Sequence, residues 1–137
     1  MNEPNRPLVT FALFAYNQEK YIREAVVGAL QQDYSPIEII ISDDCSTDKT
    51  FEIIQELSEE YEGCAKIILN RNKKNVGLIG HINKVMDIAS GELVIVAAKD
   101  DISLSDRVSK NVKFYLDMGK PDSILVTILI LTKPDVL

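Results

Sequence analysis

Short apolar runs alternate with segments of helical periodicity along nearly the whole chain, and this alternation limits the folds open to it. The apolar runs cover residues 8–14, 37–42, 65–70, 92–98 and 123–131. Between them, apolar residues recur every three or four positions over residues 22–30, 53–61, 78–89 and 108–116. Five strands that alternate with four helices predict an α/β domain with a mostly parallel sheet.

The composition of the strands indicates where the helices lie. Each strand reads as a continuous apolar run, which is typical of a sheet covered by helices on both faces. The 137 residues, 46% of them hydrophobic and 26% charged, fit one domain with a real core. No repeat or linker divides the chain. We therefore expect residues 1–137 to form one unit that ends just after the fifth strand.

Polar residues and glycines next to the helical segments suggest where the helices begin and end. Asn17 is expected to cap the first helix and Ser105 the fourth, because short polar side chains satisfy free N–H groups there. Gly91 is expected to end the third helix and Gly119 the fourth, as C-terminal glycines commonly do.

Charge and cysteine content exclude several functional classes. Lys and Arg total 15 against 21 Asp and Glu, which gives a net charge of −6 and argues against nonspecific nucleic-acid binding. Cys45 and Cys64 lack metal-like spacing and suit a reducing compartment.

The N-terminus has no pattern typical of a secretory signal peptide. The longest apolar run is far shorter than the ~20 residues that span a bilayer. We expect a cytoplasmic protein, with peripheral association at the inner face of the cell membrane left open.

Ligands of open parallel sheets bind at the carboxyl ends of the strands, so the residues that follow each strand are the candidates for function. Polar and acidic residues gather at these positions. They are Ala15, Tyr16 and Asn17 after the first strand, Asp43 and Asp44 after the second, and Lys99, Asp100 and Asp101 after the fourth.

The adjacent aspartates Asp100 and Asp101 are the strongest indication of a metal site. Two neighbouring carboxylates repel each other, which raises the pKa of one of them unless a cation intervenes. Mg²⁺ or Mn²⁺ would remove that penalty, since both prefer oxygen ligands and bind substrate phosphates at the same time. The alternative is that one aspartate caps the helix near Ser105 and the other is solvated.

The remaining candidates have equally plain alternatives. Asp43 and Asp44 can serve turn and cap chemistry, or accept hydrogen bonds from a base or a ribose. Tyr16 offers a flat face for a base, and Asn17 an amide. His81, the single histidine, is expected to be a surface or hydrogen-bonded helix residue rather than a catalytic one.

The order of these motifs resembles family 2 glycosyltransferases with the GT-A fold. The segment "PLVTFALFAYNQEKYIREAVVGALQQDYSPIEIIISDDCSTDKT" is similar to the family's opening, with its Tyr–Asn step, its Q-x-Y element and its "DD-x-S-x-D-x-T" motif. The later "NVGLIGHINKVMDIASGELVIVAAKDD" is similar to the family's N-x-G loop, Asn-bearing helix and metal-binding aspartates. The resemblance extends over roughly residues 7–115.

The resemblance implies that a sugar is transferred from a nucleotide-diphospho-sugar, with a UDP-sugar as the favoured donor, to an unknown acceptor. It implies metal dependence on Mn²⁺ or Mg²⁺, an inverting reaction and a place in cell-surface polysaccharide biosynthesis. The implied nucleotide-binding residues are Ala15, Tyr16, Asn17, Asp43, Asp44, Asn83 and Lys99, with Tyr16 against the base and Asp44 accepting its hydrogen bond. The implied metal ligand is Asp100, with Asp101 beside it.

The chain departs from the family pattern at three places. Ala98 and Lys99 replace the first two positions of a D-x-D motif, and Lys99 would then meet a phosphate. Cys45 stands where glycine or asparagine is common, so a positive φ there would carry modest strain. The acceptor half and the general base are expected beyond Leu137.

Other functions remain open on the sequence. The chain can be a nucleotide-sugar-binding unit without catalysis. A phosphoacceptor receiver domain would explain "IIISDDCS" and the lysine–proline step at Lys133, but the intervals between its motifs fit poorly. A dinucleotide-binding domain fits less well, since "GLIG" lacks the required glycine spacing. A bare sheet edge could also promote self-association.

Overall fold

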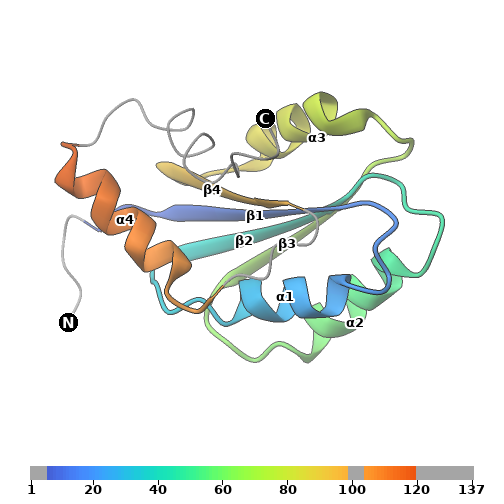
Figure 1. The fold of residues 1–137 in the computed structure, drawn as a ribbon, viewed down its shortest axis with the longest axis horizontal. Helices are drawn as coiled ribbons and strands as arrows, with labels where there is room; N and C mark the ends of the chain where they lie inside the picture. The colour runs from blue at the N-terminus through green and yellow to red at the C-terminus, as the bar shows by residue number, and fades with distance from the viewer. Residues whose placement is uncertain (1–5, 99–103, 120–137) are drawn as a thin grey trace.

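The computed structural model describes residues 6–98 and 104–119 as a parallel sheet with helices packed on it (Figure 1). The strands are β1 (Val9–Ala15), β2 (Ile37–Asp43), β3 (Lys66–Arg71) and β4 (Leu93–Ala98). The helices are α1 (Ile22–Leu30), α2 (Thr50–Glu60), α3 (Gly77–Ile88) and α4 (Arg107–Asp117). The strand order is β3-β2-β1-β4 and every pair is parallel, which confirms the α/β prediction. The fifth predicted strand lies outside the described residues.

Both faces of the sheet are covered, as the continuous apolar strands predicted. Successive side chains of a strand point to opposite faces. Phe11 and Leu13 of β1 accordingly belong to a large core cluster with residues of α1, α2 and α4. Ala12 and Phe14 pack instead with Val85 of α3 on the other face. Figure 1 shows α1 and α2 on one side of the sheet and α3 on the other.

Two predicted helix caps are wrong, because both polar residues are used elsewhere. Asn17 lies well before α1 with φ 49, and its side chain bonds to another loop. The Ser105 side chain does not cap α4, and the Ser105 carbonyl accepts a hydrogen bond from Asp33 N. The free N–H of Val108, in the first turn of α4, donates instead to Gln32 Oε1 at 2.9 Å. A side chain distant in sequence therefore caps α4, and local pattern could not reveal it.

Gly91 does not end α3, which stops three residues earlier at Ile88. Its role is a close approach between two backbones. A Cβ atom at Gly91 would lie 2.5 Å from Thr10 N, and the Gly91 N–H donates to Thr10 Oγ1 at 2.8 Å. Gly119, in contrast, follows α4 with φ 79, as predicted for a C-terminal glycine.

The loops that follow β1 and β2 are joined by side-chain hydrogen bonds, an arrangement that we call the loop clasp (residues 17–19 with residues 46–50). Three successive N–H groups of the first loop donate to side chains of the second. Asn17 N donates to Ser46 Oγ at 2.8 Å and Gln18 N to Thr50 Oγ1 at 2.7 Å. Glu19 N donates to Asp48 Oδ2 at 3.2 Å.

The loop clasp also works in the opposite direction. Thr47 N donates to Asn17 Oδ1 at 2.8 Å, and Lys49 N donates to Glu19 Oε1 at 3.2 Å. Each loop thus satisfies backbone groups of the other. The clasp fixes the carboxyl ends of two neighbouring strands against each other, which is where the sequence places its candidate site.

Replacing Thr50 by valine tests the loop clasp. Thr50 is fully buried, and valine keeps its shape but leaves the Gln18 N–H without an acceptor. An unsatisfied buried donor costs about 1–3 kcal/mol, so the free energy of unfolding in urea should fall by that amount.

Thr47→Val is the matched control. Thr47 is exposed, its hydroxyl lies 3.3 Å from Asn17 Oδ1, and its N–H bond survives the change. We expect an effect within about 0.5 kcal/mol. Equal losses for the two valine variants would contradict the role given to the clasp.

Candidate functional site

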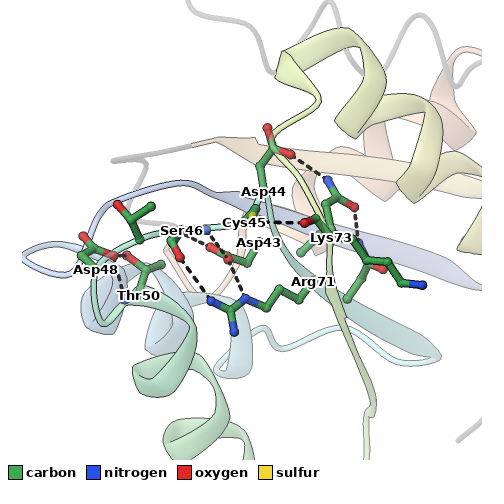
Figure 2. Close-up of polar contacts among 12 residues, drawn as sticks. Asp43, Asp44, Cys45, Ser46, Asp48, Thr50, Arg71 and Lys73 are labelled. Carbon is green, nitrogen blue, oxygen red and sulfur yellow. Dashed lines mark hydrogen bonds and ion pairs between the residues drawn. The ribbon is translucent and has the colours of Figure 1, made fainter.

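Asp43, at the end of β2, is buried beneath the turn that it organises (Figure 2). Its Oδ2 accepts a hydrogen bond from Ser46 N at 2.8 Å, and its Oδ1 accepts one from Ser46 Oγ. Arg71 Nε lies 3.7 Å from Asp43 Oδ2. The side chain is 0% exposed, so its contacts serve the turn. A nucleotide contact by Asp43 itself stays a prediction.

The turn that follows Asp43 has the backbone strain expected from the sequence. Cys45 adopts φ 63, a conformation that favours glycine or asparagine. Contacts from β3 and the residues after it hold the turn in place. Arg71 donates to Ser46 O at 3.2 Å and lies over the Phe51 ring at 4.9 Å, while the Cys45 thiol lies 3.6 Å from Lys73 O.

Asp44 is the residue on which most of the site converges. Its side chain accepts hydrogen bonds from Asn72 Nδ2 at 2.8 Å, Val76 N at 2.9 Å and Gly77 N at 3.0 Å. The last two are free N–H groups at the N-terminus of α3, where negative charge is favoured. A carboxylate has about four acceptor positions, and the described residues fill three of them.

The charge of Asp44 is stabilised by these donors. Burial raises the pKa of the carboxyl, but the hydrogen bonds from Asn72, Val76 and Gly77 outweigh burial and bring the pKa below its ordinary 3.8. Asp44 is therefore ionised at neutral pH although only 4% of its surface is exposed. The turn-and-cap alternative and the ligand alternative both remain compatible with this geometry.

Residues after β1 reach the same edge of the sheet. Ala15 O accepts a hydrogen bond from Asp44 N at 3.0 Å, and Ala15 pairs with Asp43 in the sheet register. Tyr16 follows directly and is 44% exposed, so its ring is available to a ligand. Asn17 belongs to the loop clasp. The predicted gathering of these residues is confirmed, and their contacts with a nucleotide stay predictions.

The other predicted site residues are less well defined. Asn83 lies on α3 with an exposed side chain. Lys99, Asp100 and Asp101 lie outside the described residues, as does the metal site predicted at the two aspartates. The strand before them, β4, ends at Ala98 opposite Phe14, at the same edge of the sheet. Within residues 6–98 and 104–119, no three metal-ligating side chains come together.

Sequence reasoning missed a buried polar series beside Asp44. Ser42, Asn70, Asn72 and His81 hydrogen-bond to one another, and Asn72 joins them to Asp44. His81 is accordingly a hydrogen-bonded helix histidine, as predicted, and only 4% exposed. The polar residues after β3 were the available signal. None of the helices that the structure describes is long and apolar enough to cross a bilayer.

The chain matches the family model "Glycosyl transferase family 2" over residues 10–130. The matched residues include Asp43 and Asp44, the acidic pair that suggested a phosphoacceptor receiver domain as an alternative. It is 41% identical over 105 residues to an uncharacterized protein of Mycobacterium tuberculosis, covering 75% of this chain and 30% of that one. It is 35% identical over 107 residues to "UDP-Glc:alpha-D-GlcNAc-diphosphoundecaprenol beta-1,3-glucosyltransferase WfaP" of Escherichia coli, covering 78% of this chain and 41% of WfaP.

Two solved structures have the same fold. The mannosyltransferase PcManGT from Pyrobaculum calidifontis, in complex with GDP-Man and Mn²⁺, superposes with a TM-score of 0.75 at 26% identity. That match covers 82% of this chain and 33% of PcManGT. TarS 1-349 of S. aureus, in complex with UDP-GlcNAc, superposes with a TM-score of 0.69 at 25% identity and covers 80% and 31% of the two chains.

The chain thus spans about a third of the length of the proteins it matches. Its parallel sheet, its acidic turn after β2 and the helix N-terminus bound to that turn lie within the matched residues. On this evidence the chain belongs to glycosyltransferase family 2, with the α/β architecture of the GT-A fold.

Proposed function

We propose that this chain binds the nucleotide-sugar donor of a glycosyltransferase, with a UDP-sugar as the favoured donor. The observation that carries the proposal is the ionised Asp44 carboxylate, which directly follows β2, at the same edge of the sheet as the exposed Tyr16, which directly follows β1. WfaP is named for a UDP-Glc donor and TarS was solved with UDP-GlcNAc, which supports UDP over the GDP carried by PcManGT.

The base is recognised by one charged acceptor and one aromatic surface. Asp44 has one acceptor position left, and this position suits an N–H group on the edge of a base. Tyr16 offers its face for stacking. The loop clasp holds the two strand ends together, so both contacts can form without rearrangement of the loops. Ala15 and Asp43 hold the turn that carries Asp44 through the hydrogen bonds that they accept from Asp44 N and Ser46 N. Asn83 and Lys99 are further candidates for contact with the nucleotide.

The diphosphate is held through a divalent cation at Asp100 and Asp101, with Mn²⁺ or Mg²⁺ as the ion. A bare carboxylate and a phosphate about 4 Å apart repel by about 4 kcal/mol at an effective dielectric constant near 20. The cation supplies charge neutralisation and Lewis acidity for the leaving diphosphate. PcManGT was solved with Mn²⁺ together with GDP-Man, which supports a divalent ion as the companion of the donor.

The transfer reaction itself is proposed for the whole protein. An inverting transfer to an acceptor needs a general base and an acceptor site, and the chain spans only about a third of its relatives. WfaP is named for a lipid-linked acceptor, which favours work at the inner face of the cell membrane in the assembly of a surface polysaccharide. A donor-binding unit without catalysis is the second candidate.

Calorimetric titration with UDP tests the base site. Asp44→Asn should weaken UDP binding by about tenfold, because a hydrogen bond to a charged group contributes about 1.5–3 kcal/mol and the amide carries no charge. Asp87→Asn is the control, since Asp87 is exposed on α3. Circular dichroism should show that both variants remain folded. Unchanged affinity in folded Asp44→Asn would remove Asp44 from the binding site.

The same titration with and without Mn²⁺ tests the metal site. We expect the wild-type chain to bind UDP more tightly with Mn²⁺ and Asp100→Ala to lose this dependence, because the cation neutralises the diphosphate through that carboxylate. Asp117→Ala, at the exposed end of α4, should keep the dependence. Persistence of the Mn²⁺ effect in Asp100→Ala would show that the ion binds elsewhere.

A further inference from the structure

We propose that His81, in its neutral form, is a positioning residue that orients Asp44 for nucleotide binding. The inference rests on the proposed function, because it concerns the geometry of the carboxylate that would meet the base. His81 does not contact the ligand in this proposal. It acts through a series of hydrogen bonds that we call the Asp44 relay (His81, Ser42, Asn70, Asn72 and Asp44).

The Asp44 relay is continuous, and all of its members except the half-buried Asn70 are buried. His81 Nε2 lies 2.6 Å from Ser42 Oγ, and Asn70 Nδ2 donates to the same hydroxyl at 2.9 Å. The other hydrogen of Asn70 Nδ2 is directed to Asn72 Oδ1 at 3.0 Å. Asn72 Nδ2 then donates to Asp44 Oδ1 at 2.8 Å.

The donors and acceptors of the relay are consistent with one state of His81. The Ser42 hydroxyl accepts from Asn70, and its own hydrogen can donate to His81 Nε2. In the proposed arrangement Ser42 donates to an unprotonated Nε2, and the ring is neutral with its proton on Nδ1. If Nε2 were protonated, its N–H would point at Ser42 Oγ, which already accepts from Asn70 Nδ2. The Ser42 hydroxyl could then no longer donate to His81, and the first hydrogen bond of the relay would be lost.

The relay closes into a ring through α3. Asp44 accepts hydrogen bonds from the N–H groups of Val76 and Gly77, at the start of α3. His81 lies one helical turn after Gly77. The same helix is therefore attached to Asp44 directly at its first turn and indirectly through His81. A change at His81 would therefore move the helix N-terminus and the Asn72 amide, the groups that provide the three hydrogen bonds to the carboxylate from described residues.

The surroundings of His81 favour the neutral ring. Burial lowers the pKa of His81 below its ordinary 6.5, and the charges of Asp44 and Asp43 oppose burial without overcoming it. Of the packed strands, β1 contributes the Phe14 ring with centroids 4.8 Å apart, and β3 contributes the uncharged Asn70. On α3 itself, Lys84 and Asp87 are exposed.

The sign of the pH effect follows from this shift. An unfolded chain protonates its histidine near pH 6.5, whereas the folded chain resists protonation until a lower pH. Stability contributed by neutral His81 is therefore present above pH 6.5 and declines as the pH falls toward the folded pKa. Nucleotide affinity should decline as the pH falls through the folded pKa, when the relay breaks.

Nuclear magnetic resonance of the imidazole tests the first part of the proposal. His81 is the single histidine of the chain, so its ring signals need no assignment. The wild-type ring should be neutral at pH 7, with its proton on Nδ1 and a pKa below 6.5. A proton on Nε2, or a charged ring at pH 7, would overturn the proposal without any reference to nucleotide binding.

Titration with UDP-glucose between pH 5 and pH 8 tests the second part. This probe is chosen because its esterified diphosphate lacks the second ionisation near pH 6 of a terminal phosphate. His81→Phe keeps a ring but removes the acceptor. Its affinity should be about tenfold lower at pH 7, the size seen when an outer hydrogen-bond partner of a binding group is lost. It should also lose the pH dependence, and His81→Gln, which can still accept from Ser42, should recover part of the affinity.

Phe14→Leu is the control for packing, because Phe14 touches the His81 ring but takes no part in the relay. It should lower stability and leave the affinity at pH 7 unchanged. Wild-type affinity in folded His81→Phe, or an equal loss in Phe14→Leu, would overturn the positioning role alone. Absence of UDP-glucose binding by the wild-type chain would overturn the proposed function, and this role with it.

Discussion

The hydrogen bonds between the loops after β1 and β2 are the constraint on which the site depends. Parallel strands end side by side, and the N–H groups of the residues just beyond them have no partner in the sheet. Ser46, Asp48 and Thr50 supply side-chain acceptors to three such N–H groups in a row. The side chains of Asn17 and Glu19 in turn accept hydrogen bonds from N–H groups of the loop after β2. This exchange fixes the loop that follows β1 against the loop that follows β2.

The acidic motif after β2 therefore serves the fold before it serves a ligand. Asp43 closes its own turn with Ser46 and meets Arg71, and Asp44 satisfies the N-terminus of α3. The sequence left the cap-and-turn alternative and the ligand alternative open, and the geometry is compatible with both. A carboxylate held by three donors keeps its charge and its direction, and these are the properties that recognition of a base requires.

Periodicity and strand-end position predicted the sheet, its helices on both faces and the gathering of Tyr16 with Asp44. Local cap signals failed at Asn17 and Ser105, because partners distant in sequence decide those bonds. The Asp44 relay was beyond sequence reasoning for a similar reason. It needs the register that pairs Ser42 with Asn70 and the packing that brings His81 of α3 against β2. Neither the register nor this packing is encoded in the spacing of single motifs.

The contacts also change the electrostatic argument for a cation. The sequence suggests an acidic edge of four aspartates that repels any diphosphate. In the structure, the Asp43 charge faces Arg71 and the Asp44 charge faces the N–H groups of α3 and Asn72, so both are largely offset by the protein itself. The need for a divalent ion then rests on Asp100, Asp101 and the diphosphate rather than on the whole edge. In the proposed function, base recognition and metal binding are therefore separable, each with its own charge balance.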